Sequence, residues 1–491
     1  MAGPVRAADV VVVGGGSSGC VVAARLSEDP DRTVVLLESG PGYRSAAECS
    51  SVLDYRTLPV GPRSPYGDTY GIELTPGIPS AMVRGHVLGG SGAVNGAYFI
   101  RGTAPDFDRW PPSWSYEHVL PFFRALETDV DFEGPLHGAT GPVPVRRQPA
   151  DRLSAVSAAF HLAALDLGFA EEADKNGRDG EGIGPVPLNV GDGRRVSTAS
   201  AYLLPALDRP NLTVDVDSHV VRILFSGTRA VGVEIDSGGA RRVVRADRVV
   251  LTAGAVETPV LLMHSGIGPA EHLRDNGIRP VTDAPGVGSD FSDHPEVGLP
   301  YRVRAPLRRD ATSPVLEAVL NVGQIEIRPY TASFDVLVPG SGQPVPRLGI
   351  GMMTPESRGR IRLASPHRRV RPRIEYRYAE TDSDRRALRD GVALGVELLR
   401  SPAFRPLVES VSEEVSDNAV RAHLGTSQHL CGSCRMGDSD DAGAVVDERC
   451  NVHGIDGLTI ADTSVFPVVP SRGPHATAVM VAERVSTFLS G

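Results

Sequence analysis

The fold of this chain is decided by Asp9-Val10-Val11-Val12-Val13-Gly14-Gly15-Gly16-Ser17-Ser18-Gly19, a β-branched apolar run that leads into a glycine turn. A helical pattern follows, and a second apolar run, 33–37, ends in Glu38. The motif G-x-G-x-x-G binds a dinucleotide when it lies between a strand and a helix that are followed by a second strand and an acidic residue. This chain has these parts in that order. The sequence therefore predicts a Rossmann-like unit at the start of the chain.

Each position of this motif has a physical reason. Gly14 permits the tight turn, Gly16 lets the backbone approach a pyrophosphate, and Gly19 lets the helix pack closely on the strand. The helix N-terminus presents free N–H groups and a positive dipole end to the phosphates. Glu38 stands where a carboxylate accepts hydrogen bonds from both hydroxyls of an adenosine ribose.

Length and composition limit the remaining interpretations. The chain has 491 residues, so more than one structural unit is expected. Its net charge of -10 disfavours a nucleic-acid partner. It contains no apolar run of about 20 residues that would span a bilayer, and its first eight residues do not resemble a signal peptide. We expect a cytoplasmic protein, with peripheral membrane contact left open. Five cysteines, an odd number, argue against a disulfide framework.

The pattern along the chain predicts two units. We expect a discontinuous nucleotide-binding domain over 1–299, completed by 426–491, and a sheet-based substrate domain over 300–425. Residues 46–80 are rich in Ser, Pro and Gly and are expected to form loops. Apolar spacing predicts helices over 115–127, 152–168, 256–265, 383–400 and 416–424.

Five segments in a fixed order carry a resemblance to a known family. They are 14–19 with Glu38; 85–96; 254–268; His429-Leu430-Cys431-Gly432-Ser433-Cys434; and 462–467 with 474–477. A sixth, weaker one is Gly286-Val287-Gly288-Ser289-Asp290-Phe291-Ser292-Asp293-His294-Pro295. Over nearly its full length the chain resembles the glucose–methanol–choline (GMC) flavoprotein oxidoreductases. The resemblance implies an α/β fold with an α+β second unit, FAD as the cofactor, and oxidation of an alcohol carbon.

A narrower resemblance rests on 126–132, 134–138, 142–147 and 326–331. These segments look like the mycofactocin-associated GMC dehydrogenases of actinobacteria. That branch is associated with re-oxidation of the reduced peptide-derived cofactor mycofactocin and with electron transfer toward respiration. The implied partners are a small or peptide-derived alcohol and a respiratory electron acceptor.

The family motif implies a catalytic base at His429, which would take the hydroxyl proton as hydride leaves. Imidazole titrates near neutrality and fits this role. The second catalytic position of the family is usually His or Asn, and here it is Gly473. His475 is the candidate replacement, and Arg472 is a weaker one.

The resemblance also implies the FAD contacts. The segment 91–95 lacks the His through which some members attach FAD, so the cofactor is expected to be non-covalent. The implied contacts are Gly14, Gly16, Ser17, Ser18, Gly19, Glu38, Gly90, Ser91, Asn95, Gly96, Ala97, Val220, Asp462, Thr463, His475, Ala476 and Thr477.

Two features of the sequence have an alternative interpretation. Cys431, Cys434, Cys450 and His453 have the spacing of a structural zinc site, and Cys431 with Cys434 could form a redox pair. An ordinary motif cysteine with a small buried neighbour is favoured over both, and no metal is expected. The arginine run 368–371 is expected to be a solvated face.

Two other functional classes stay open. One is an oxidase of a small or aromatic alcohol that releases hydrogen peroxide. The other is a catalytically impaired flavin-binding protein, which Gly473 alone favours. A dehydrogenase is preferred on the narrower resemblance.

Overall fold

The computed structural model describes residues 7–45, 47–178 and 180–491. The expectation that the chain lacks a secretory signal rests mostly on residues 1–6, which lie outside this range. Among the described residues, no helix is both long and apolar enough to cross a membrane.

A seven-stranded sheet is built around the first strand, β1, in the order β10-β2-β1-β13-β12-β11, with β24 also paired to β13. β1 runs parallel to β2 and β13. Its valines are buried because a parallel sheet is covered on both faces. The strands are β1 (Ala7–Val13), β2 (Val34–Leu37), β10 (Leu212–Asp215), β11 (His219–Ser226), β12 (Arg229–Ser237), β13 (Ala240–Leu251) and β24 (Leu458–Ile460).

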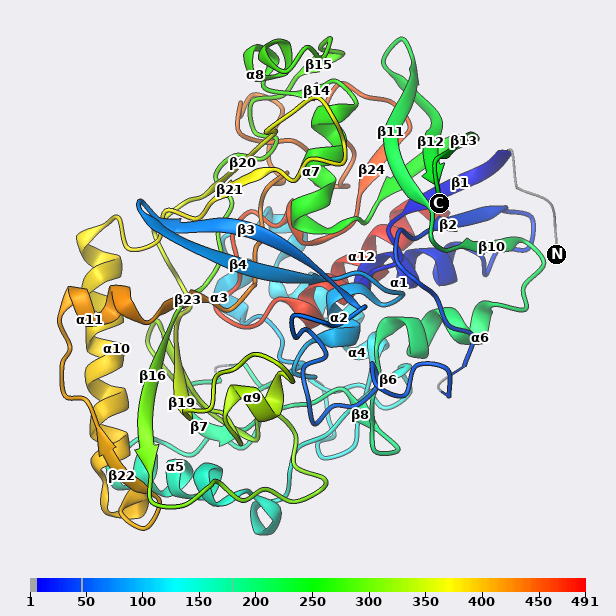
Figure 1. Ribbon diagram of the computed structural model, residues 1–491. Helices are drawn as coiled ribbons and strands as arrows, with labels where there is room; N and C mark the ends of the chain where they lie inside the picture. The colour runs from blue at the N-terminus through cyan, green and yellow to red at the C-terminus, as the bar shows by residue number, and fades with distance from the viewer. Residues whose placement is uncertain (1–6, 46, 179) are drawn as a thin grey trace.

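The first and last helices of the chain lie side by side against this sheet (Figure 1). They are α1 (Ser17–Leu26) and α12 (His475–Ser490). The Ser18 hydroxyl donates to the carbonyl oxygen of Ala478 at 3.4 Å, and Arg25 pairs with Glu483 at 2.9 Å. The predicted α/β fold with a Rossmann-like unit is therefore confirmed.

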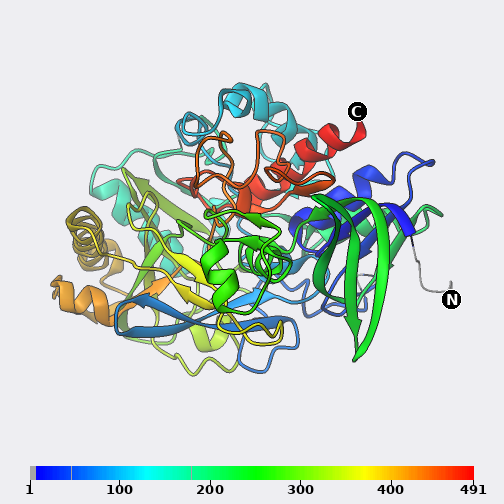
Figure 2. The same ribbon diagram turned by 90° about the horizontal axis from the view of Figure 1, so that it is seen from above.

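A second seven-stranded sheet has the order β22-β16-β19-β18-β17-β7, with β23 paired to β16. The helices α5 (Ala155–Asp166) and α10 (Asp382–Arg400) pack on it. Figure 2 shows α10 at the opposite end of the molecule from β11–β13. The strands are β7 (Gly182–Pro185), β16 (Pro295–Val303), β17 (Ala318–Val322), β18 (Ile325–Pro329), β19 (Arg347–Met352), β22 (Val408–Val411) and β23 (Leu424–Thr426). Two of these elements, β7 and α5, precede residue 300.

A smaller four-stranded sheet corrects part of the loop prediction. The segment expected to be loop contains β3 (Gly67–Thr75), which pairs with β4 (Ile78–Gly85). The apolar side chains of this hairpin alternate and are buried on one face: Tyr70, Ile72, Leu74 and Met82. β20 (Arg360–Arg362) and β21 (Arg373–Glu375) complete this sheet and take no part in the larger second one.

The predicted helices form within a few residues of their expected bounds. In addition to α5 and α10 they are α4 (Tyr116–Leu126), α7 (Gly254–His264) and α11 (Asp417–Ala422). A short helix, α2 (Gly90–Val94), lies in the second glycine-rich segment.

Candidate active site

The glycine turn after β1 brings three backbone segments into contact. Gly14 has a φ of +102°, and a Cβ on it would lie 2.7 Å from the carbonyl oxygen of Thr252. A Cβ on Gly19 would lie 1.9 Å from the Gly14 carbonyl oxygen, so α1 starts close to β1 only with glycine at this position. A Cβ on Gly90 would lie 2.8 Å from the Cα of Gly16. We call the surface formed by these two glycine segments, 14–19 and 89–92, the glycine cradle.

Glu38 directly follows β2, beside the cradle, and is held by backbone N–H groups. Its Oε2 accepts from the N–H of Gly15 at 2.7 Å, and its Oε1 accepts from that of Gly40 at 2.7 Å. Burial raises the pKa of this carboxyl, while the two N–H groups oppose the rise. The Ser39 hydroxyl also donates to Oε1 at 3.4 Å, so Oε2 is the oxygen that retains a lone pair for a ribose hydroxyl.

His475 starts α12 and points toward the glycine cradle. Its Nδ1 lies 3.3 Å from the side-chain amide nitrogen of Asn95, which donates, so the ring proton sits on Nε2. That Nε2 is buried and has no hydrogen-bond partner among the described residues. A Cβ on Gly92 would lie 2.4 Å from this Nε2 and 2.4 Å from the Ser17 hydroxyl. An orphaned donor at a glycine-lined surface fits a diphosphate group bound there.

One cavity extends from the glycine cradle to His429. Its wall includes most of the residues that the sequence assigned to the cofactor, namely Gly14, Gly16, Ser17, Ser18, Glu38, Gly90, Ser91, Asn95, Gly96, Val220, Asp462, Thr463 and His475. The other four are buried and lie outside this wall: Gly19, Ala97, Ala476 and Thr477.

Asp462 reaches the cavity wall with its carboxylate already bound by the chain. Its Oδ2 accepts from the N–H of Gly254 at 2.9 Å and from the hydroxyl of Thr258 at 2.6 Å. Its Oδ1 accepts from the N–H of Ser464 at 2.8 Å. Asp462 therefore ties the start of α7 to the C-terminal segment and fixes the backbone of this wall.

His429 is hydrogen-bonded to a second histidine, and the contact fixes which ring nitrogen is free. His294 Nε2 lies 3.0 Å from the carbonyl oxygen of Pro470, so this nitrogen carries the proton and donates. His294 Nδ1 is then an acceptor, and it lies 2.8 Å from His429 Nδ1, which must donate. His429 Nε2 is therefore left without a proton, as a general base requires.

The surroundings keep both imidazoles neutral. Burial lowers the pKa of His429 well below its usual value, and His294, Arg328 and Arg84 lower it further. Burial, with Arg328, lowers the pKa of His294 to about 3. His429 is thus in its basic form throughout the neutral range.

Asp293 fixes the backbones of both histidines. Its Oδ1 accepts from the N–H of His294 at 2.6 Å and from the N–H of His429 at 2.7 Å. The Thr426 hydroxyl donates to its Oδ2 at 3.1 Å. Asp293 and His294 lie in the weaker sixth segment, and the sequence predicts no role for either. The only signal in the sequence for these two residues was their position, as a polar pair directly before a proline at the start of a strand.

Gly473 lies beside the free nitrogen of His429. A Cβ on it would lie 3.8 Å from His429 Nε2 and 3.7 Å from Ile100, so there is room for a side chain that the sequence omits. Arg472 is buried and turned elsewhere, because its guanidinium donates to the carbonyl oxygen of Gly180 at 3.1 Å. His475, which faces the cradle, makes no hydrogen bond to His429 in the described part of the chain.

The wall beyond His429 combines a charged network with apolar side chains. Arg328 pairs with Glu296 and donates to the Ser427 hydroxyl at 2.8 Å. Tyr330 donates to Glu296 at 3.1 Å. Apolar residues of the same wall are Leu58, Val60, Val315, Leu316 and Phe334. A substrate here would meet both charged and apolar side chains.

Family models match most of this chain. The N-terminal GMC oxidoreductase model matches residues 8–296, and the C-terminal model matches 355–482. The chain belongs to the GMC oxidoreductase family. It is therefore an oxidoreductase of a flavoprotein family that acts on alcohol-type donors.

Several relatives of this GMC oxidoreductase cover nearly its whole length. An uncharacterized GMC-type oxidoreductase of Rhodococcus erythropolis is 54% identical over 99% of this chain and 98% of its own. An oxygen-dependent choline dehydrogenase of Brucella ovis is 33% identical over 99% and 96%. The crystal structure of pyridoxine 4-oxidase from Mesorbium loti has a TM-score of 0.91 and 30% identity, covering 98% of this chain and 99% of its own.

The cysteine-based alternatives are not supported in this GMC oxidoreductase. Among the described residues, the group of His, Cys, Asp and Glu side chains close enough to share an ion is Glu127, Asp129 and His137, so the four proposed zinc ligands do not converge. Burial raises the thiol pKa of Cys431 and of Cys434 well above the usual value. A redox pair needs the opposite shift.

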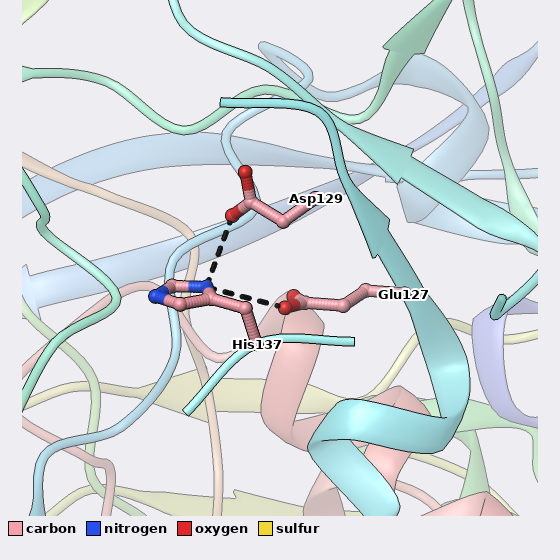
Figure 3. Close-up of side chains that lie close together, drawn as sticks. All are labelled: Glu127, Asp129 and His137. Atoms are coloured by element: carbon pink, nitrogen blue, oxygen red, sulfur yellow. Dashed lines mark ion pairs between the residues drawn. The ribbon is translucent and has the colours of Figure 1, made fainter. Parts of the chain in front are cut away.

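The Glu127–Asp129–His137 cluster is an ion-pair network (Figure 3). β5 (Glu127–Asp129) places the two carboxylates two residues apart, on one face. His137 Nδ1 lies 3.2 Å from Asp129 and 3.6 Å from Glu127, and its Nε2 lies 2.9 Å from Asp174. Arg101 pairs with Glu127, and Arg147 with Asp129. Hydrogen bonds to Asp129, Asp174 and Glu127 raise the pKa of His137 to about 10.

Replacing His137 with glutamine is expected to lower the melting temperature by several degrees near pH 6.5, because the buried carboxylates of Glu127 and Asp129 and the half-buried one of Asp174 lose a cationic partner. The folded-state pKa lies above the unfolded one, so this stabilisation is complete below about pH 6.5 and is lost as pH rises through 10. Thermal unfolding from pH 6 to pH 10 would show the difference from wild type shrinking. An undiminished difference at pH 10 would contradict a charged His137; His118→Gln, on the surface, is the control.

Proposed function

We propose that this GMC oxidoreductase is a dehydrogenase that oxidises a CH–OH group with non-covalently bound FAD. The observation that carries the proposal is the unprotonated Nε2 of His429 in a cavity that also contains the glycine cradle. FAD, when bound, supplies the two-electron acceptor. Glu38, Ser17, Asn95 and the backbone around Val220 are the residues that would hold it.

The proton of the reaction is handled by the chain itself. His429 Nε2 accepts the hydroxyl proton of the substrate, and the resulting imidazolium keeps donating from Nδ1 to His294. The partly buried position of the ring and the apolar wall around the cavity exclude bulk water from this transfer. Gly473 has no side chain to hold the substrate oxygen, so the proton transfer depends mainly on His429.

The narrower proposal names the substrate and the acceptor. We infer that the enzyme re-oxidises reduced mycofactocin in the cytoplasm and passes the electrons toward the respiratory chain. The likeness of 126–147 and 326–331 to that branch supports this, as does the relative from an actinobacterium, Rhodococcus erythropolis, at 54% identity. The competing proposal is an alcohol oxidase, which the similarity to pyridoxine 4-oxidase favours.

Reaction with oxygen separates these two proposals without a known substrate. Holoenzyme would be photoreduced under anaerobic conditions and then mixed with air-saturated buffer, and the return of the oxidised flavin band at about 450 nm would be followed. A dehydrogenase is expected to recover over many minutes. Recovery within seconds, with hydrogen peroxide formed, would establish the oxidase and contradict the mycofactocin assignment. A flavin that no alcohol and no reduced mycofactocin reduces would indicate the impaired binding protein.

A further inference from the structure

The loop between β20 and β21 makes ion pairs with the nucleotide-binding part of the molecule. Arg368 pairs with Glu257, at the start of α7, and Arg371 lies 2.8 Å from Asp68 on β3. Arg371 also lies 3.8 Å from Glu257. The expectation that 368–371 is a solvated run is therefore wrong for Arg368, whose side chain is only 13% exposed.

These contacts converge on one carboxylate. Tyr70 donates to Glu257 Oε1 at 2.7 Å, and the Arg371 guanidinium lies 4.4 Å above the Tyr70 ring. Burial by itself would raise the pKa of Glu257, but Arg368, Tyr70 and Arg371 outweigh it and hold the pKa at about 2. Glu257 is thus a permanent anion shared by two arginines from one loop.

The same residues line the cavity at its nucleotide end. Arg368, Arg371, Tyr70 and Glu257 are part of the wall that includes Glu38 and Val220. Two histidines, His219 (next to Val220) and His264, lie close enough to Arg368 for its positive charge to lower their pKa values. Burial, with Arg368, lowers the pKa of each of these histidines to about 4, so both are neutral at pH 7 and do not repel the arginines.

We propose that Arg368 and Arg371 form a clasp, anchored on Glu257, that closes the nucleotide end of the cavity and slows the release of non-covalently bound FAD. The clasp joins three segments that are far apart in sequence: β3, α7 and the β20–β21 loop. Opening it requires separation of a largely buried ion pair, which costs more than breaking an exposed one. The inference rests on the non-covalent binding proposed above.

The same loop contains a matched control. Arg369 pairs with Asp236 at 3.0 Å, but its side chain is 80% exposed, and it does not line the cavity. An ion pair this exposed contributes little. Arg369→Ala therefore removes one arginine from the loop and leaves the proposed clasp intact.

The test follows FAD release from purified holoenzyme. Acid precipitation first shows whether the flavin is free; flavin that stays with the protein would overturn both the non-covalent proposal and the clasp. Diluted holoenzyme is then followed by the rise of free-flavin fluorescence at increasing NaCl. Wild type and Arg369→Ala are expected to release FAD slowly at low salt and faster at high salt. Arg368→Ala and Glu257→Gln are expected to release it about tenfold faster at low salt, with little further dependence on salt.

Two comparisons decide the outcome. The double variant, Arg368→Ala with Glu257→Gln, should release FAD no faster than either single variant, because both remove the same contact. Thermal unfolding of the apo-proteins separates a clasp from a general loss of stability. The proposal would be overturned if Arg368→Ala released FAD within twofold of the rate of Arg369→Ala. It would also be overturned if a tenfold faster release came with an equally large drop in the free energy of unfolding of the apo-protein.

Discussion

Replacing His429 with glutamine is expected to lower kcat for alcohol oxidation by about 10³-fold, because the reaction loses the group that accepts the hydroxyl proton. FAD content and the rate at which the photoreduced flavin reacts with oxygen should stay at the wild-type level. Steady-state turnover with the best alcohol of a panel, together with flavin content, measures both. His423→Gln, an exposed histidine outside the cavity, is the control.

The pH profile provides a second check on His429. Burial and its cationic neighbours keep its pKa well below the usual value, so the base is unprotonated across the neutral range. kcat/KM is therefore expected to be flat across the neutral range and to fall only when the pH drops toward that lowered pKa. An acid limb centred at 6.5 or above, or full turnover by His429→Gln, would show that another group is the base.

Replacing His294 with leucine is expected to lower kcat by about 10²-fold with little change in KM. The loss arises because His429 Nδ1 then has no acceptor, and nothing holds the proton away from Nε2. His294 thus acts as a positioning residue through His429. Steady-state kinetics of the variant, at wild-type flavin content, measures the effect.

The matched variant is His294→Gln. A glutamine amide has one acceptor for His429 Nδ1 and one donor for the carbonyl oxygen of Pro470, so it satisfies both contacts of the imidazole. We expect it to recover most of the turnover that leucine loses. Equal losses in both variants would mean that His294 only fills space.

Prediction from the sequence succeeded where the signal was local. The valine run, the glycine turn and Glu38 lie within thirty residues of one another, and each has a single physical use, so β1, α1 and β2 follow from them. The β3–β4 hairpin was missed because Ser, Pro and Gly around it masked a clear alternation of Tyr70, Ile72 and Leu74. The sequence also did not predict that β20 and β21 join the sheet of β3 and β4, because the residues of a strand do not specify which distant strand it pairs with.

The sequence by itself determined the family, the Rossmann-like unit and the candidate base, because these depend on residue types at fixed short spacings. Only the tertiary structure decided which groups face one another. It paired His429 with His294 from a segment more than a hundred residues away, and it turned His475 toward the glycine cradle. It also converted an apparently solvated arginine into a largely buried partner of Glu257. Protonation states and ion pairs depend on such long-range contacts, and the linear sequence does not encode them at any fixed spacing.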